Sequence, residues 1–270
     1  MSTIIYTADL HGNEEFFRML LKKAGEEKVN AIIIGGDLCP RIGKTIQQKI
    51  HNQRLFLKDF LFPLFNDFKR NNNAEIFLIM GNDDFRINMP ALENAEKNNI
   101  LKSIHMKSLK LDENLNIVGY SFVNPTPFRL KDWEKPDFEN DKAPEQLFEE
   151  EIRSISKEHG TINEDLKNLK KLSDPKNTIY VIHAPPFNAN LDIIATGIHV
   201  GSKAVREFIE KENPFLSLHG HIHESPKLSG SWKDKIGGTI CINVGSSYPE
   251  DKLNCVVINT EDLNNIKYFG

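Results

Sequence analysis

TIIYTADLHG, residues 3–12, is an apolar, β-rich run that ends in the polar pair Asp9 and His11. Residues 13–27 follow with apolar side chains at helical spacing, and residues 31–34 form the next apolar run. A strand, a helix and a strand within about 30 residues is the usual size of a parallel crossover. The N-terminal stretch therefore predicts an α/β fold that begins with parallel strands.

Later apolar runs predict further strands and a mixed sheet arrangement. They cover residues 76–80, 178–182, 215–218, 239–244 and 255–258, while residues 107–111 and 116–122 read as a hairpin. Helices are expected over residues 45–70 and 203–211. Residues 124–175 begin with several prolines and continue with many charges. We interpret this segment as a rim insertion, a loop followed by one or two exposed helices, within a single domain spanning residues 1–270.

Composition limits the function classes. The chain has 270 residues and a net charge of −4, which argues against a general nucleic-acid binder because such proteins carry a basic surface. No apolar run approaches the roughly 18 residues of a spanning helix, so no membrane association is expected. Three widely spaced cysteines without a C-x-x-C pair fit a reducing cytoplasm best.

Potential metal ligands follow four of the predicted strands. Asp9, Asp37, Asn82 and His183 each lie one to three residues beyond an apolar run. Ligands collect at the carboxyl ends of strands in sheets of this kind, so these segments can converge. The pairs Asp9/His11 and His221/His223 have i, i+2 spacing, which directs both side chains of a pair to one side of an extended backbone.

In order, the blocks D-x-H, G-D, G-N, H-x-P-P and G-H-x-H resemble the calcineurin-like metallophosphoesterase superfamily across residues 9–223. The resemblance implies a four-layer αββα sandwich of two mixed β-sheets flanked by helices. It also implies two metal ions: one bound by Asp9, His11 and His223, the other by Asn82, His183 and His221, with Asp37 bridging them. Histidine, carboxylate and amide ligands suit divalent Mn, Fe, Zn, Co or Ni.

This centre would hydrolyse phosphate esters by attack of a metal-bridging hydroxide. Many members of the superfamily carry a histidine after the G-N block as a proton donor, whereas Asp83 and Asp84 stand here. An ionised carboxylate repels a dianionic phosphate, which favours a phosphodiesterase acting on a small nucleotide-like or other diester. One interpretation is that Asp83 is a proton donor. The alternative is that Asp83 or Asp84 orients a metal-bound histidine.

The candidate catalytic residues are Asp37, Asn82, Asp83 and His199. His199 lies in a glycine-flanked loop before a helix that Ser202 can cap, and it is a candidate for contacting substrate. His219 is expected to support the ligands or to lie in the core.

Arg41 and Arg86 follow metal blocks and either contact phosphate or lie in solvent. The expected partner is a small phosphate ester, and the oligomeric state is left open. The alternatives are a nuclease, a protein or small-molecule phosphomonoesterase, and a non-catalytic scaffold of the same fold, which the complete ligand set disfavours.

Overall fold

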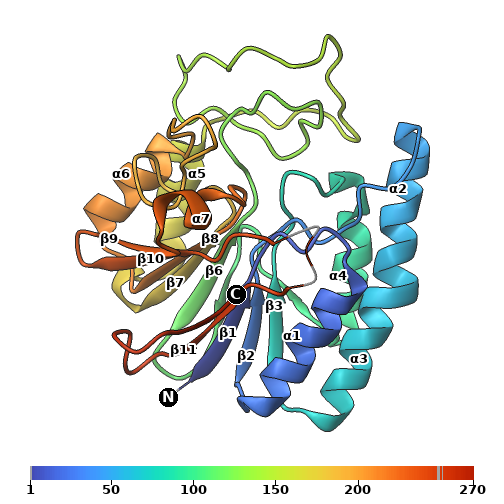
Figure 1. The fold of residues 1–270 in the computed structure, drawn as a ribbon, viewed down its shortest axis with the longest axis vertical. Coiled ribbons are helices and arrows are strands. Elements are labelled where there is room, and N and C mark those ends of the chain that lie inside the picture. The colour runs from blue at the N-terminus through green and yellow to red at the C-terminus, as the bar shows by residue number, and fades with distance from the viewer. Residues whose placement is uncertain (1, 248–249, 251) are drawn as a thin grey trace.

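In the computed structural model, which describes residues 2–247, 250 and 252–270, two mixed six-stranded sheets pack together between layers of helices (Figure 1). The first sheet has the order β12 (Lys267–Phe269), β11 (Cys255–Asn259), β1 (Thr3–Thr7), β2 (Ala31–Ile34), β3 (Glu75–Leu78) and β4 (Lys102–Ser103). Strands β1 to β4 are parallel, whereas β11 is antiparallel to β1 and β12.

The second sheet has the order β5 (Ser108–Lys110), β6 (Asn116–Tyr120), β7 (Thr178–Ile182), β8 (Leu216–His219), β10 (Thr239–Asn243) and β9 (Lys233–Ile236). Its central strands β6, β7, β8 and β10 are parallel, and both edges are antiparallel. The predicted hairpin is present as β5 and β6. The predicted α/β sandwich of two mixed sheets is therefore confirmed.

The helices on the side of the first sheet come from the N-terminal half of the chain (Figure 1). They are α1 (Glu14–Glu26), α2 (Ile46–Leu55), α3 (Phe62–Asn71) and α4 (Met89–Lys97), with a π-helical segment, Phe56–Leu61, joining α2 to α3. Helices α5 (Ile162–Leu169) and α6 (Lys203–Glu212) lie on the side of the second sheet, and α7 (Ser225–Ser229) is a short helix after β8. Ser202 caps α6, as predicted, by accepting a hydrogen bond from Val205 N.

Side chains that alternate along each strand contribute to two separate hydrophobic clusters. In β1, Ile5 joins the cluster that contains the helix side chains, whereas Ile4 and Tyr6 join the cluster between the sheets. Successive side chains of a strand point to opposite faces, so each strand of a four-layer fold must be apolar on both. This explains why the strands read as continuous apolar runs.

The charged segment differs in part from expectation. Residues 124–161 form loops above the sheets, drawn in green to yellow in Figure 1, and contain no helix. Helix α5 was expected to be exposed, but it buries Ile162, Leu166 and Leu169 in the core. These apolar side chains recur at i, i+4 and i+7, so they lie on one face of α5. That face packs into the core, although the surrounding sequence is highly charged.

No helix in the described part of the chain is both long enough and apolar enough to cross a membrane.

The inter-sheet cluster predicts a stability difference between two leucines. Leu216 of β8 is fully buried between the sheets, whereas Leu172 is 50% exposed. Leu216→Ala should lower the free energy of unfolding by about 2–5 kcal/mol because it removes packed apolar atoms and leaves a cavity. Leu172→Ala, the matched control, should change it by less than about 1 kcal/mol. Urea denaturation measures both, and equal effects would contradict the assigned packing.

Candidate metal centre

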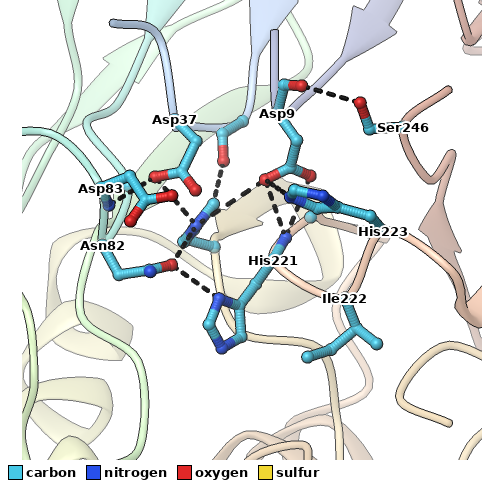
Figure 2. Close-up of polar contacts among 12 residues, drawn as sticks. Asp9, Asp37, Asn82, Asp83, His221, Ile222, His223 and Ser246 are labelled. Carbon is cyan, nitrogen blue, oxygen red and sulfur yellow. Dashed lines mark hydrogen bonds and ion pairs between the residues drawn. The ribbon is translucent and has the colours of Figure 1, made fainter. Parts of the chain in front are cut away.

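The predicted ligands come from the carboxyl ends of strands in both sheets and meet at one edge. Those from the first sheet are Asp9 and His11 after β1, Asp37 after β2 and Asn82 after β3. Those from the second sheet are His183 after β7 and His221 and His223 after β8. Figure 2 shows several of these side chains pointing toward one another. The structure thus brings together all seven residues that were predicted to be metal ligands.

A first group of ligand atoms lies around two histidine nitrogens. Nε2 of His11 is 3.0 Å from Nε2 of His223, and the latter is 3.5 Å from Oδ1 of Asp9. One ligand atom from each of Asp9, His11, Asp37 and His223 lies within 4.8 Å of the others. Nitrogen and carboxylate oxygen donors at this spacing suit a divalent transition metal.

A second group of donor atoms surrounds the side-chain oxygen of Asn82. This Oδ1 atom lies 2.6 Å from Nδ1 of His221 and 3.0 Å from Nε2 of His183. The contact between Asn82 and His221 is drawn as a dashed line in Figure 2. The three donor atoms therefore converge on a second small volume.

Asp37 lies between the two groups. Its Oδ2 atom is 3.8 Å from Nε2 of His11, and its Oδ1 atom is 3.6 Å from Nε2 of His183. Oδ1 also accepts a hydrogen bond from the backbone N–H of Asp83 at 2.8 Å. Each carboxylate oxygen thus faces a different group of donors, which is the geometry that a bridging ligand requires.

The electrostatics of the site keep most of its donors in ligand form. Burial lowers the pKa of His11 to about 4 and that of His221 to about 3, so both imidazoles are neutral at pH 7. Burial raises the pKa of Asp9, but His223 and His183 outweigh it and hold the carboxyl below its usual value. Neutral imidazoles and ionised carboxylates are the forms that bind metal ions.

His223 and His183 are the exceptions. Burial lowers the pKa of His223, but Asp9 and Asp37 outweigh it and raise the value. Burial also lowers the pKa of His183, but Asp37 and Asp9 more than compensate and raise it to about 9. Its Nδ1 atom lies 2.7 Å from the carbonyl oxygen of Gly35. Hydrogen bonding of Nδ1 to this carbonyl leaves Nε2 directed toward Asn82 and Asp37.

The backbone is unusual at four of these residues. Asp9, His11, Asp37 and His221 have φ angles of 58°, 45°, 50° and 69°. Such positive values are uncommon for residues other than glycine and gather at functional sites. Here the loops are held by backbone hydrogen bonds, from Asp9 N to Gly36 O and from His11 N to Asp37 O.

Gly81 is required by close approach. A Cβ atom at this position would lie 2.6 Å from Nε2 of His183 and still closer to Oδ1 of Asp37. Gly220 is constrained in the same way, because its Cβ would lie 2.6 Å from Oδ2 of Asp9. Each glycine therefore allows a ligand from the other sheet to come near.

A cavity of about 1190 Å³ adjoins the centre, and its lining includes Asp37, Asn82, Asp83, His221 and His223. Aromatic side chains form part of its wall, among them Phe85, Phe128, Phe148 and Phe187. Loops of the 124–161 segment contribute to this wall. The centre is therefore accessible to a ligand much larger than inorganic phosphate.

The two aspartates after Asn82 have different surroundings. Asp83 forms an ion pair with Arg41, and its Oδ2 atom is 3.7 Å from Nδ1 of His11. Burial, followed by the charge of Asp37, raises the pKa of Asp83 to about 7. Asp84 accepts backbone hydrogen bonds from Leu38, Cys39 and Gly81, so its carboxylate holds the loops together. The contact with His11 places Asp83 to orient a metal-binding histidine.

Arg41 and Arg86 also differ. Arg41 lines the cavity, and its Nη2 atom lies 3.4 Å from Nε2 of His11. Arg86 is neither in the cavity lining nor free in solvent, because it pairs with Glu158 and lies over the ring of Trp133 at 4.8 Å. Burial of this arginine among aromatic rings explains why the expectation of a phosphate contact or a solvated side chain fails for it.

The remaining candidate histidines fall in different places. His219 is buried, and its Nδ1 atom lies within 3.0 Å of the carbonyl oxygens of Ile182 and Ala184, on either side of His183. His199 lies in the cavity lining, and its Nδ1 atom is 2.6 Å from Oδ1 of Asp192.

The roles of several supporting residues were not predicted from the sequence. Asn243 donates from Nδ2 to the carbonyl oxygens of Leu191, Gly220 and Ile222, and Ser246 donates to that of Asp9. Trp133 donates to the carbonyl oxygen of Asp84 and so ties the charged segment to the loop after β3. The buried tryptophan was the available signal, since such a side chain usually has a partner for its N–H.

Comparison with known sequences assigns the chain to a family. A sequence model of the calcineurin-like phosphoesterases matches residues 2–225, and this protein belongs to that family. The chain is also 35% identical over 197 residues to the uncharacterized protein MJ1162 of Methanocaldococcus jannaschii, covering 70% of this chain and 73% of that protein. Family membership and the ligand cluster make it a metal-dependent phosphoester hydrolase.

Solved structures are similar in fold. The crystal structure of TT1561 of Thermus thermophilus matches with a TM-score of 0.65 and 15% identity, covering 99% of this chain and 97% of that chain. Another crystal structure matches with a TM-score of 0.69 and 16% identity, covering 99% and 98%. At these identities the likeness concerns the fold alone.

Gly81→Ala should weaken metal binding without unfolding the protein. The added methyl group would collide with the side chains of Asp37 and His183, so a ligand must move away. We expect Mn²⁺ affinity in isothermal titration to fall at least about tenfold, the scale typical of disturbed metal-site geometry. Gly25→Ala is the control, because its Cβ in α1 meets nothing nearer than 3.9 Å. Equal affinities of the two variants would count against the assigned centre.

Metal affinity should increase with pH. With its pKa raised to about 9, His183 carries a proton at neutral pH that a bound metal must displace. Affinity should therefore rise between pH 6 and pH 9, by up to about tenfold per pH unit if this proton alone is displaced. Calorimetry in buffers of different ionisation enthalpy measures the proton release. A pH-independent affinity with no proton release would contradict this assignment.

Proposed function

We propose that the protein is a dinuclear metal-dependent phosphodiesterase that hydrolyses a small nucleotide-like or other organic diester. The observation that carries this proposal is the position of Asp37, whose two carboxylate oxygens face separate groups of nitrogen and oxygen donors. A single-ion site would have no need of a second group of donors around Asn82. Two adjacent groups that share one carboxylate are the arrangement of a two-metal site.

These distances support an assignment of ligands to each ion. We assign Asp9, His11 and His223 to one ion, Asn82, His183 and His221 to the other, and Asp37 to both. The donors fit divalent Mn, Fe, Zn, Co or Ni. When bound, such ions supply positive charge for the phosphate oxygens and lower the pKa of a coordinated water toward neutrality.

The charged residues around the centre support a singly charged substrate. Asp9, Asp37 and Asp83 place three carboxyl groups around the phosphate position, and Arg41 is already paired with Asp83. A phosphate monoester carries about two negative charges at neutral pH, whereas a diester carries one. The diester therefore meets less repulsion from Asp83.

The cavity supports the same choice. A diester has an organic group on each side of its phosphorus, and the volume of about 1190 Å³ beside the ligands leaves room for both. Arg41 lines this cavity beside His11, where its ion pair with Asp83 holds it.

We also propose a cytoplasmic location. Cys39, Cys241 and Cys255 are buried and unbridged, as expected in a reducing compartment.

A pair of substrates tests the preference. Loaded with Mn²⁺, the protein should hydrolyse bis-p-nitrophenyl phosphate with a kcat/KM at least about tenfold above that for p-nitrophenyl phosphate, because the second negative charge costs on the order of 1 kcal/mol or more near Asp83. Release of p-nitrophenolate, followed by absorbance, measures both rates. A clear preference for the monoester would reject the diester assignment.

Asp37→Ala is the matched blank for this assay. Loss of the shared carboxylate should abolish activity on both esters, while Leu172→Ala, altered at an exposed position, should retain it. If wild type and Asp37→Ala are indistinguishable on every ester, the hydrolytic function itself is refuted.

A further inference from the structure

The loop between β7 and α6 contains a buried carboxylate with four hydrogen-bonding partners. Asp192 is fully buried, and its Oδ2 atom accepts the backbone N–H groups of Asn188 and Gly201 at 3.1 and 2.9 Å. Its Oδ1 atom accepts the N–H of Ala189 at 3.0 Å and lies 2.6 Å from Nδ1 of His199. The carboxylate is held from both sides, so it provides a rigid support for one imidazole.

The contact with Asp192 determines which ring nitrogen of His199 can contact a ligand in the cavity. A carboxylate accepts hydrogen bonds, so Nδ1 of His199 carries the hydrogen in the bond to Asp192. The other ring nitrogen, Nε2, remains for a ligand. The side chain is 30% exposed and belongs to the lining of the cavity that also contains Asn82 and His221.

The loop is attached to metal-ligand segments at two places along its length. Near His183, Ser202 N donates to Pro185 O and Phe187 N donates to Ser202 O. Near His221 and His223, Asn243 holds the carbonyl oxygen of Leu191 together with those of Gly220 and Ile222.

A further bond runs from Ile193 N to the hydroxyl of Ser225 at the start of α7. In addition, Asn124 donates to the carbonyl oxygen of Val200. His199 therefore has a fixed position relative to the metal centre rather than that of a side chain on a free loop.

The reaction proposed above lacks an assigned proton donor for the leaving group. The segment after Asn82 offers Asp83, but its carboxylate is in an ion pair with Arg41 and lies beside His11. Expulsion of an alkoxide or a weakly acidic phenolate is slow unless a proton is delivered to the departing oxygen. A positioned imidazole in the same cavity can meet this need.

We propose that His199 donates a proton from Nε2 to the leaving-group oxygen and that Asp192 is the positioning residue that aims it. This inference rests on the phosphodiesterase function proposed above. The P–O bond to the leaving group breaks, the electron pair stays on the departing oxygen, and this oxygen takes the proton from Nε2. Water supplies the hydroxyl group that bonds to phosphorus and releases its other proton to solvent, and the imidazole takes a proton from solvent at Nε2.

Two diesters of equal charge test the step. Methyl p-nitrophenyl phosphate releases a stable anion that needs no proton, whereas methyl phenyl phosphate releases a more basic oxygen. His199→Gln, which keeps an N–H for Asp192, should reduce kcat on the phenyl ester by about 10²-fold or more and on the nitrophenyl ester by less than about tenfold. His159→Ala, changed at an exposed histidine elsewhere, should leave both rates unaltered.

Two further variants separate catalysis from loop structure. Imidazole added to His199→Ala should restore turnover of the phenyl ester, which a purely structural role would not allow. Asp192→Asn should show the same leaving-group dependence to a smaller degree. Circular dichroism and metal content identify any variant that misfolds, and His199→Gln then remains the decisive comparison.

The outcomes distinguish the two proposals. Equal loss on both esters without imidazole rescue would overturn the role of His199 and leave the phosphodiesterase function standing. A wild-type protein that hydrolyses neither ester would instead refute the function proposed in the preceding section.

Discussion

The centre depends on direct contact between the two sheets at the carboxyl ends of their parallel strands. Asp9, from the first sheet, accepts the backbone N–H of His221, from the second, with both carboxylate oxygens at 3.0–3.1 Å. Just below, the hydroxyl of Tyr6 donates to the carbonyl oxygen of His219 at 2.6 Å. Neither sheet alone supplies a complete set of ligands, so the site is a property of the packed sandwich.

Close approach of the sheets also explains the irregular backbone around the centre. Asp9, His11, Asp37 and His221 have positive φ angles, and each such residue costs on the order of 1 kcal/mol. The hydrophobic cluster between the sheets, together with bonds such as Ser246 to Asp9, maintains these conformations. The loops therefore direct their side chains inward before any ion arrives, which lowers the cost of organising the ligands.

Prediction from sequence succeeded where local chemistry repeats along the chain. Long apolar runs located the central strands, and the rule that ligands follow parallel strands brought Asp37, Asn82 and His183 together. The edge strands β4, β9 and β12 have two to four residues and were missed, because short strands with an exposed face leave no apolar run. One or two exposed helices were expected in the charged segment; α5 is the helix present there, and its burial depends on tertiary contacts with α6.

Pairings between irregular loops could not be predicted for a different reason. Arg41 and Asp83 come from separate strand-end loops, and nothing in their spacing indicates that they meet. Asp192 and His199 are seven residues apart in a loop without helical or strand periodicity. The ligand positions were thus predictable from strand topology, whereas the partners of Asp83 and His199 required the folded loops.

The hydrogen bond from Trp133 to Asp84 lies at the boundary between two parts of the molecule whose sequences can evolve at different rates. It attaches the 124–161 loops to the rigid segment after β3 at a point where the indole is fully buried. Outside this attachment point, Phe128 and Phe148 of the cavity wall are about half exposed and are not part of the buried core. Substitutions there can reshape substrate selection during evolution while the chemistry at the sheet edge stays the same, so related chains with identical ligands can diverge in what they hydrolyse.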